Sequence, residues 1–107
     1  MIKREKRRYL ALKVFSEQIV EEFTVFNAVK DSVLGLFGEY GASKTSLKQV
    51  KYFPEKNQVI LRCSHVMLEQ VRAAIAAIIE INGKSAAVHV VAVSGTLKAL
   101  SKKIQKN

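Results

Sequence analysis

The sequence has a single cysteine, a single proline, no tryptophan and no long apolar run among its 107 residues. One cysteine, Cys63, cannot form an internal disulfide bond, and with two distant histidines it does not make a zinc site. The longest stretch without a charged residue, 85–97, has 13 residues, whereas a bilayer-spanning helix needs about 20 apolar ones. No apolar run or small-residue cleavage site follows the basic N-terminus. We therefore expect a cytoplasmic chain with no membrane partner.

The composition is that of a folded protein, with 49% apolar and 25% charged residues. A chain of this length forms one domain around one modest core. Its 18 lysine and arginine residues outnumber 9 acidic residues, which gives a net charge of +9. A small domain with this excess of positive charge usually binds a polyanion.

The positive charge is concentrated at the two ends of the sequence. Residues 1–8 and residues 98–107 each carry a net charge of +4, while the body between them carries only +1. Clustered basic ends suit phosphate contacts, although basic ends that simply keep a small protein soluble are the plainer alternative. On charge alone we expect nucleic-acid contacts from Lys3, Arg4, Lys6, Arg7, Lys102 and Lys103.

The apolar pattern predicts four strands, over 8–16, 46–53, 58–63 and 84–93. The first of these alternates clearly, and one side of it would carry Leu10, Leu12 and Val14. Its other side would carry Tyr9, Ala11, Lys13 and Phe15. The only proline falls in the turn 54–57, where its missing N–H does no harm.

Three helices are expected between and after these strands. The first would have Thr24 as its N-cap, Gly41 as a left-handed C-cap, and an apolar stripe of Phe26, Val29, Val33, Leu36, Phe37 and Tyr40. The second, over 65–81, would be capped by Ser64, stopped by Asn82-Gly83, and apolar along Leu68, Val71, Ile75, Ile78 and Ile79. The third would open at 94–96 and place Leu97, Leu100 and Ile104 on one side.

The resulting order is β-α-β-β-α-β with an added C-terminal helix. This is the split βαβ pattern of the α+β ferredoxin-like folds, which have one antiparallel sheet with both helices on one face. We divide the chain into a basic N-terminal arm, 1–7, and a single domain, 8–107, that includes the basic C-terminal helix.

The last predicted strand is apolar on both faces, with Val88, Val90 and Ala92 on one face and Val91 and Val93 on the other. An antiparallel sheet with one wet face should alternate, so something must cover the second face. The C-terminal helix could cover it, or a protein partner or a second copy of the chain could. For a partner, we expect the interface to include Val66, Leu68, Val91 and Val93.

We find no convincing catalytic set in the sequence. Cys63 and His65 are only near neighbours, and a buried core cysteine is the more ordinary interpretation. The acidic residues are scattered, whereas a metal-dependent nuclease needs several converging carboxylates. We therefore expect that the chain binds no cofactor and catalyses nothing by itself.

RNA binding is the better physical interpretation, although the aromatic and basic pattern of an RNA recognition motif is missing from the central strands. Contacts should instead come from the basic ends. The run Ser94-Gly95-Thr96-Leu97-Lys98 offers free N–H groups at a helix start, with a lysine in the first turn. An ordinary capped helix is the plain alternative.

Several landmarks together resemble the archaeal ribonuclease P protein component 2 family. They are RRYLALKV in the first strand, LFGEYGASK in the first helix, VILRCSHVMLEQVRAAI from the third strand into the second helix, ING before the last strand, and VSGTLKAL at the terminal helix. They occur in the family's order over roughly residues 8–100. The strand-RC-helix-VR unit followed by VSGTLK is the most specific of them.

The resemblance implies a protein subunit of ribonuclease P, the ribonucleoprotein that removes the 5′ leader from precursor tRNA. In that enzyme the RNA is the catalyst and uses Mg²⁺ ions. The resemblance also implies a ferredoxin-like fold and association with ribonuclease P protein component 3, with other protein subunits and with precursor tRNA. A homodimer is left open.

The resemblance carries a role in RNA contact to six matched positions, namely Arg8, Arg62, Ser94, Gly95, Thr96 and Lys98. Arg62 could alternatively pair with a helix carboxylate such as Glu69. Two other functions compete with the subunit hypothesis. One is a generic RNA-binding module of ribosome assembly or translation, and the other is a small-molecule-binding or oligomeric ferredoxin-like protein with incidental basic ends.

Overall fold

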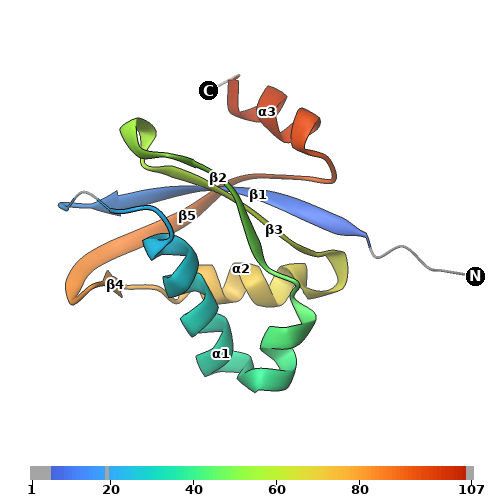
Figure 1. The fold of residues 1–107 in the computed structure, drawn as a ribbon, viewed down its shortest axis with the longest axis horizontal. Helices are drawn as coiled ribbons and strands as arrows, with labels where there is room; N and C mark the ends of the chain where they lie inside the picture. Colours follow the sequence, from blue (N-terminus) through green and yellow to red (C-terminus); the bar gives the residue numbers. More distant parts are fainter. Residues whose placement is uncertain (1–5, 19, 106–107) are drawn as a thin grey trace, which may run out of the picture.

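An antiparallel sheet separates two helices on one face from a third helix on the other (Figure 1). The computed structural model describes residues 6–18 and 20–105. The elements in this part of the chain are β1 (Arg7–Ser16), α1 (Thr24–Lys44), β2 (Lys48–Phe53), β3 (Gln58–Ser64), α2 (Leu68–Ala76), β4 (Glu80–Ile81), β5 (Lys84–Ser94) and α3 (Leu97–Gln105). Single 3₁₀ turns, Pro54–Lys56 and His65–Met67, lie after β2 and β3.

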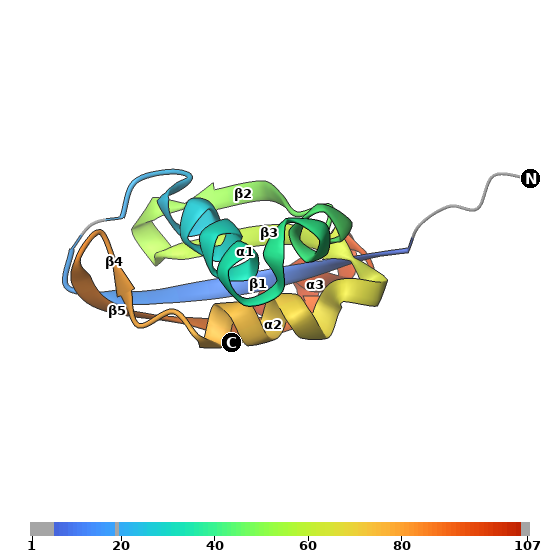
Figure 2. The ribbon, with the colours of Figure 1, turned by 90° about the horizontal axis from the view of Figure 1, so that it is seen from below.

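The strand order in this part of the chain is β2-β3-β1-β5-β4, and the neighbouring strands are antiparallel. β1 is therefore central and pairs with both β3 and β5 (Figure 2). This confirms the predicted ferredoxin-like split, with one short extra strand, β4, at the edge.

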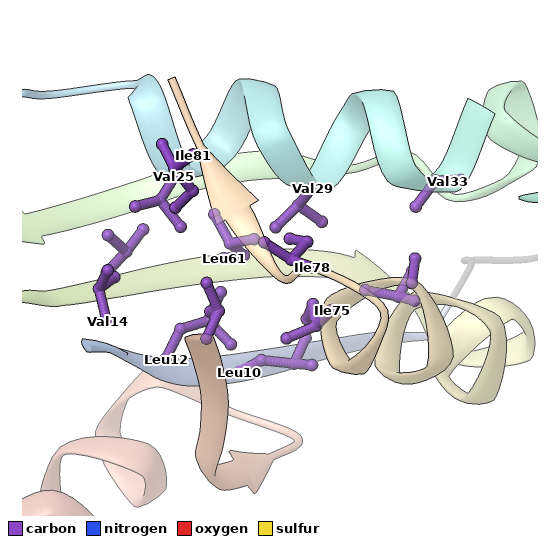
Figure 3. Packing of buried hydrophobic residues seen from close by; sticks show 14 of the residues in the cluster. Leu10, Leu12, Val14, Val25, Val29, Val33, Leu61, Ile75, Ile78 and Ile81 are labelled. Atoms are coloured by element: carbon purple, nitrogen blue, oxygen red, sulfur yellow. The ribbon is translucent and has the colours of Figure 1, made fainter. Parts of the chain in front are cut away.

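The main core lies between the sheet and the helices α1 and α2 (Figure 3). Leu10 and Leu12 of β1 are completely buried there, as is Val29 of α1. Burial of each such side chain contributes about 1.5–3 kcal/mol. Val25 also lies in this core, although the predicted stripe did not include it.

The C-terminal helix covers part of the other face, as one of the two sequence interpretations proposed. Leu100 of α3 is completely buried against Ala11 of β1 and Ile60 of β3. The predicted division of β5 into two apolar faces is wrong at its end. The register with β1 shifts between Ala11 and Leu12, so an extra residue of β5 lies between the partners Val90 and Ala92. This bulge turns Val93 back toward the main core.

The predicted end of the first helix is also wrong. Gly38, not Gly41, has the left-handed backbone, with φ 73° and ψ 177°, and it kinks α1. Gly41 is instead a site of close packing, because an added Cβ would lie 2.7 Å from the Cβ of Phe37. Beyond Val33 the stripe leaves the core, and Leu36, Phe37 and Tyr40 are exposed. At the other end, Phe23 rather than Thr24 is the N-cap residue, and it makes no side-chain cap.

The second helix is shorter than predicted. It ends at Ala76, and the chain then forms β4, which pairs with the start of β5. Asn82 and Gly83 both have positive φ, 53° and 78°, which suits the tight two-residue turn of a hairpin rather than a helix stop. Ile79 is consequently exposed, while Ile78 and Ile81 remain in the core.

Ser64 does not cap the second helix as predicted. Its hydroxyl donates a 2.9 Å hydrogen bond to the carbonyl of Lys44 and so ties the end of β3 to the end of α1. The other strand boundaries lie within two residues of those predicted.

Candidate nucleic-acid interface

Antiparallel pairing gathers the predicted RNA-binding residues at one end of the sheet. Arg7 pairs with Ser64 and Tyr9 pairs with Ser94, so the start of β1 lies beside the ends of β3 and β5. The start of α3 follows immediately after β5. We call this region the basic end and define it by Lys6, Arg7, Arg8, Arg62, Ser94, Gly95, Thr96 and Lys98.

Arg8 is half-buried at the basic end, on the strand position paired with Cys63. One of its Nη atoms donates a 3.0 Å hydrogen bond to the carbonyl of Arg7. The same nitrogen would lie 3.5 Å from a Cβ added to Gly95. The guanidinium of Arg8 therefore bridges the start of β1 and the loop before α3.

Arg62 lies on the other face of the sheet, toward α3, because side chains alternate along β3 and Ile60 faces α3. Its neighbours across the strands are Tyr9 of β1 and Lys48 of β2. Its Nε atom is buried and has no hydrogen-bond partner. A polar atom of this kind is satisfied when a ligand or water reaches it.

The alternative pairing of Arg62 with Glu69 does not form. Glu69 is exposed on α2, which packs on the opposite face of the sheet from α3. Because side chains alternate between the two faces along β3, Arg62 faces α3 and lies on the opposite side of the sheet from Glu69. The spacing of the two residues along the chain does not reveal this separation.

The start of α3 is capped by Thr96, which is what the alternative of an ordinary capped helix predicted. The Thr96 hydroxyl accepts a 3.1 Å hydrogen bond from the amide of Ala99, and its carbonyl accepts one of 3.1 Å from the amide of Leu100. The amides of Leu97 and Lys98 have no intrahelical acceptor, since they lie in the first turn. These two amides, beside the exposed Lys98 side chain, give the helix start the features of an anion site.

The remaining predicted basic residues have different surroundings. Lys6 is exposed, and its carbonyl accepts a 2.8 Å hydrogen bond from the amide of His65. Lys102 is exposed on α3, and the ammonium of Lys103 donates a 2.6 Å hydrogen bond to the carbonyl of Val93. Lys3 and Arg4 lie outside the described residues.

Lys48 is a residue of this region that sequence reasoning did not select. It comes to the basic end only through the register of the β2–β3 hairpin, which places it opposite Arg62. Tyr9 was assigned to the correct side of its strand, but not to a contact with RNA. The register of the β2–β3 hairpin places Lys48 beside Arg62, and the register of β1 with β3 places Tyr9 there.

The four residues predicted for a protein interface divide into two pairs. Val66 and Val91 are exposed, by 74% and 43%, whereas Leu68 and Val93 are partly buried against the main core. Three further apolar residues are exposed toward the end of α1, where the predicted stripe continued, namely Leu36, Phe37 and Tyr40.

Cys63, the one cysteine of the sequence, is a free, buried thiol. Burial raises the pKa of the Cys63 thiol to about 11, and the charge of Arg8 opposes this, so the thiol stays protonated at neutral pH. The ring of His89 lies 4.9 Å from that of Phe15, centroid to centroid. Among residues 6–18 and 20–105, no three His, Cys, Asp or Glu side chains could together hold a metal ion, and no helix is both long and apolar enough to cross a membrane.

Sequence comparisons with known proteins all place this chain in the same family. Residues 8–105 match the Rpp14/Pop5 family. Ribonuclease P protein component 2 of Methanosarcina mazei is 36% identical over 100 residues, which are 94% of this chain and 84% of that protein. The protein of the same name from Methanobrevibacter smithii is 34% identical over 110 residues and covers 96% of this chain and 92% of its own length. The one from Pyrococcus furiosus is 32% identical over 94% of this chain and 83% of its own.

A solved structure shares the fold. A chain in the cryo-EM structure of yeast ribonuclease MRP aligns with a TM-score of 0.72 over 99% of this chain and 93% of that chain. The sequences are only 12% identical, so this likeness concerns the fold alone.

Proposed function

Because this chain belongs to the Rpp14/Pop5 family, we propose that it acts as a protein subunit of ribonuclease P, the ribonucleoprotein that removes the 5′ leader from precursor tRNA. The RNA of that enzyme is the catalyst, and the chain associates with this RNA and with other protein subunits. The observation that carries the proposal is the family match over residues 8–105, which includes nearly all of the basic end.

The basic end is the surface that we assign to the RNA. Its cations come from β1, β3 and α3, so they are held at fixed separations by the sheet and the core. Arg8 and Arg62 can each donate two parallel hydrogen bonds to one phosphate, which a lysine cannot do. The uncapped amides at the start of α3 add donors of a second kind. Neutralised phosphates allow RNA strands to approach one another.

The chain's contribution to catalysis would be indirect. We propose that Mg²⁺ is bound by the ribonuclease P RNA and precursor tRNA, and that the basic end stabilises the folded RNA around those ions. We also propose ribonuclease P protein component 3 as a partner, with Val66 and the exposed apolar end of α1 as its contact surface. The cytoplasm is the proposed location, and a homodimer through the same apolar surface is the competing use of it.

A reconstitution assay tests the function. Cleavage of precursor tRNA by the matching ribonuclease P RNA is followed at low Mg²⁺, with component 3, in the presence and absence of this chain. We expect cleavage only when both proteins are present. If the chain binds the RNA but leaves cleavage unchanged, the generic RNA-binding alternative is favoured.

Arg62 provides the first variant for this assay. We expect Arg62→Ala to raise the chain concentration needed for half-maximal cleavage by roughly 10- to 100-fold, because a hydrogen bond to a charged group contributes about 1.5–3 kcal/mol. Arg62→Lys should recover only part of this loss, since it keeps the charge but not the planar donors. Lys30→Ala, an exposed site on α1, is the matched control and should behave as the wild type. Equal activity of Arg62→Ala and Lys30→Ala would remove Arg62 from the interface.

A further inference from the structure

One edge of the sheet is open in its middle. β5 is the edge strand beyond β1, and β4 pairs only with its first two residues, Lys84 and Ser85 (Figure 2). The amide of Ala86 then donates a 3.0 Å hydrogen bond to the carbonyl of Ile79. At the far end of β5, the ammonium of Lys103 donates a hydrogen bond to the carbonyl of Val93. The edge is therefore covered at both ends and uncovered between them.

The backbone groups that point out of this gap belong to Val88 and Val90. Successive residues of an antiparallel strand direct their N–H and C=O groups to opposite sides. Since the amide of Ala86 points away from β1, the amides and carbonyls of Val88 and Val90 do so as well. Together they present two donors and two acceptors to an added strand.

A groove runs beside these groups, between β5 and α2. It has a volume of about 450 Å³, and its lining includes Arg72, Ile75, Ala76, Ile78, Val88 and Val90. The residues that line it have apolar side chains, apart from Arg72 and His89, and Arg72 is exposed on α2. No carboxylate is among the described residues that line it.

The open edge lacks the usual protection against pairing. Natural edge strands are commonly shielded by lysine or proline residues along their length. The segment 86–93 contains neither, and its one device is the bulge at Val91. That bulge limits the length of a new strand but leaves Val88 and Val90 free to pair.

We propose that this open edge is a docking site for a short extended segment of another protein subunit, a segment that carries apolar residues and a carboxylate. The segment would pair with the backbone of Val88 and Val90, place an apolar side chain over Ile75 and Ile78, and bring its carboxylate to Arg72. Strand addition of this kind takes its affinity from main-chain hydrogen bonds and its specificity from side-chain pockets. A second copy of the chain fits less well, since it would bring its own Arg72 and a net charge of +9.

Amide hydrogen exchange on the full, ¹⁵N-labelled chain tests this proposal, which rests on the proposed assembly with other subunits. The probes are the purified protein subunits of the same ribonuclease P, its RNA alone, and a raised concentration of the chain itself. We expect the Val88 and Val90 amides to exchange quickly in the free chain and to slow at least tenfold with the protein subunits. The amides of Ala87 and His89, which point toward β1, serve as internal controls and should stay slow throughout.

The other outcomes overturn the proposal in distinguishable ways. Subunits that co-elute with the chain without protecting Val88 and Val90 contradict the open edge alone, and the proposed function stands. If none of the subunits binds the chain, both the open-edge proposal and the proposed function are contradicted. Protection by the RNA alone, or by raising the chain concentration, assigns the edge to RNA or to a second copy.

Charge reversal at Arg72 tests the proposed contact between this side chain and a carboxylate of the docked segment. We expect Arg72→Glu to weaken subunit binding by roughly tenfold, because a carboxylate of the incoming segment would then face a like charge. Lys51→Glu, on the opposite edge strand β2, is the matched control with the same change in net charge. Equal binding by the two variants would contradict the assignment of a carboxylate to Arg72.

Discussion

Arg8 and Arg62 point to opposite faces of the same sheet end, although they come from neighbouring strands. Arg8 pairs with the buried Cys63, on the face of α1 and α2, whereas Arg62 pairs with Tyr9 on the face of α3. An RNA bound at the basic end therefore meets positive charge on both sides of the sheet edge. This differs from a flat basic face, where a single strand of RNA would lie across the sheet.

We expect the ionisation of Cys63 to lower the stability of the fold at alkaline pH. Desolvation raises the pKa of its thiol from 9.0 to about 11, with Arg8 opposing the shift. The unfolded chain then loses this proton first, so stability is unaffected below pH 9 and falls between pH 9 and 11. We expect the wild type to lose on the order of 2 kcal/mol over this interval relative to Cys63→Ala.

Urea unfolding of both proteins at each pH measures this difference. The comparison cancels the titration of lysines, which is common to the two proteins. The loss of the buried side chain lowers the stability of Cys63→Ala by an amount that does not depend on pH. A difference between the two proteins that stays constant from pH 8 to 11 would contradict the buried, neutral thiol.

At the scale of the elements, the sequence predicted what short-range patterns determine. The alternation of Leu10, Leu12 and Val14 located β1 and its buried side, and the 3.6-residue period located Val29 and Val33 on the core face of α1. The residues of the basic end were selected from charge clustering and from the family resemblance, and their contact with RNA stays a prediction. Only the strand pairing brings them together.

The wrong predictions have a common physical cause, because in each case tertiary contacts override the local conformational preference of the sequence. Gly38 and Gly41 both look like helix-ending glycines in the sequence. In the structure Gly38 alone has positive φ, whereas Gly41 packs closely against Phe37. The helical pattern through Ile81 is lost to the pairing of β4 with β5. The bulge in β5 and the position of Lys48 depend on strand register, and no local pattern encodes it.

The kink of α1 gives a matched pair of glycine substitutions. Gly38 has φ 73° and ψ 177°, a region open almost only to glycine, so we expect Gly38→Ala to destabilise the chain by about 1–3 kcal/mol. Gly35 lies in the regular part of the helix with nothing within 4 Å of an added Cβ. Gly35→Ala should therefore stabilise by about 0.5–1 kcal/mol. Thermal unfolding followed by circular dichroism measures both, and equal effects of the same sign would contradict the kink.

For the whole molecule, the fold brings the described part of the basic N-terminal segment, Lys6, Arg7 and Arg8, close to the start of the basic C-terminal segment at Lys98. The start of β1 and the start of α3 are about ninety residues apart in the chain, yet both adjoin the ends of β3 and β5. The body between them is nearly neutral. We expect charge arranged in this way to act locally on RNA phosphates and to contribute little to the core, so its removal should change binding without changing stability.

The salt dependence of RNA binding tests this arrangement. If about five residues neutralise phosphates, log K should fall against log salt concentration with a slope of roughly −3.5 to −4.5. Removing one contact with Lys98→Ala should make the slope less steep by about 0.7–0.9, because one fewer counterion is released. Lys30→Ala, on α1 and away from the basic end, should leave the slope unchanged. Filter binding to ribonuclease P RNA between 50 and 400 mM salt, roughly the range in which such contacts are measurable, gives all three slopes. A slope near zero would contradict the electrostatic contribution to binding. The same decrease for both variants would mean that the net charge as a whole, and not its position at the basic end, governs the affinity.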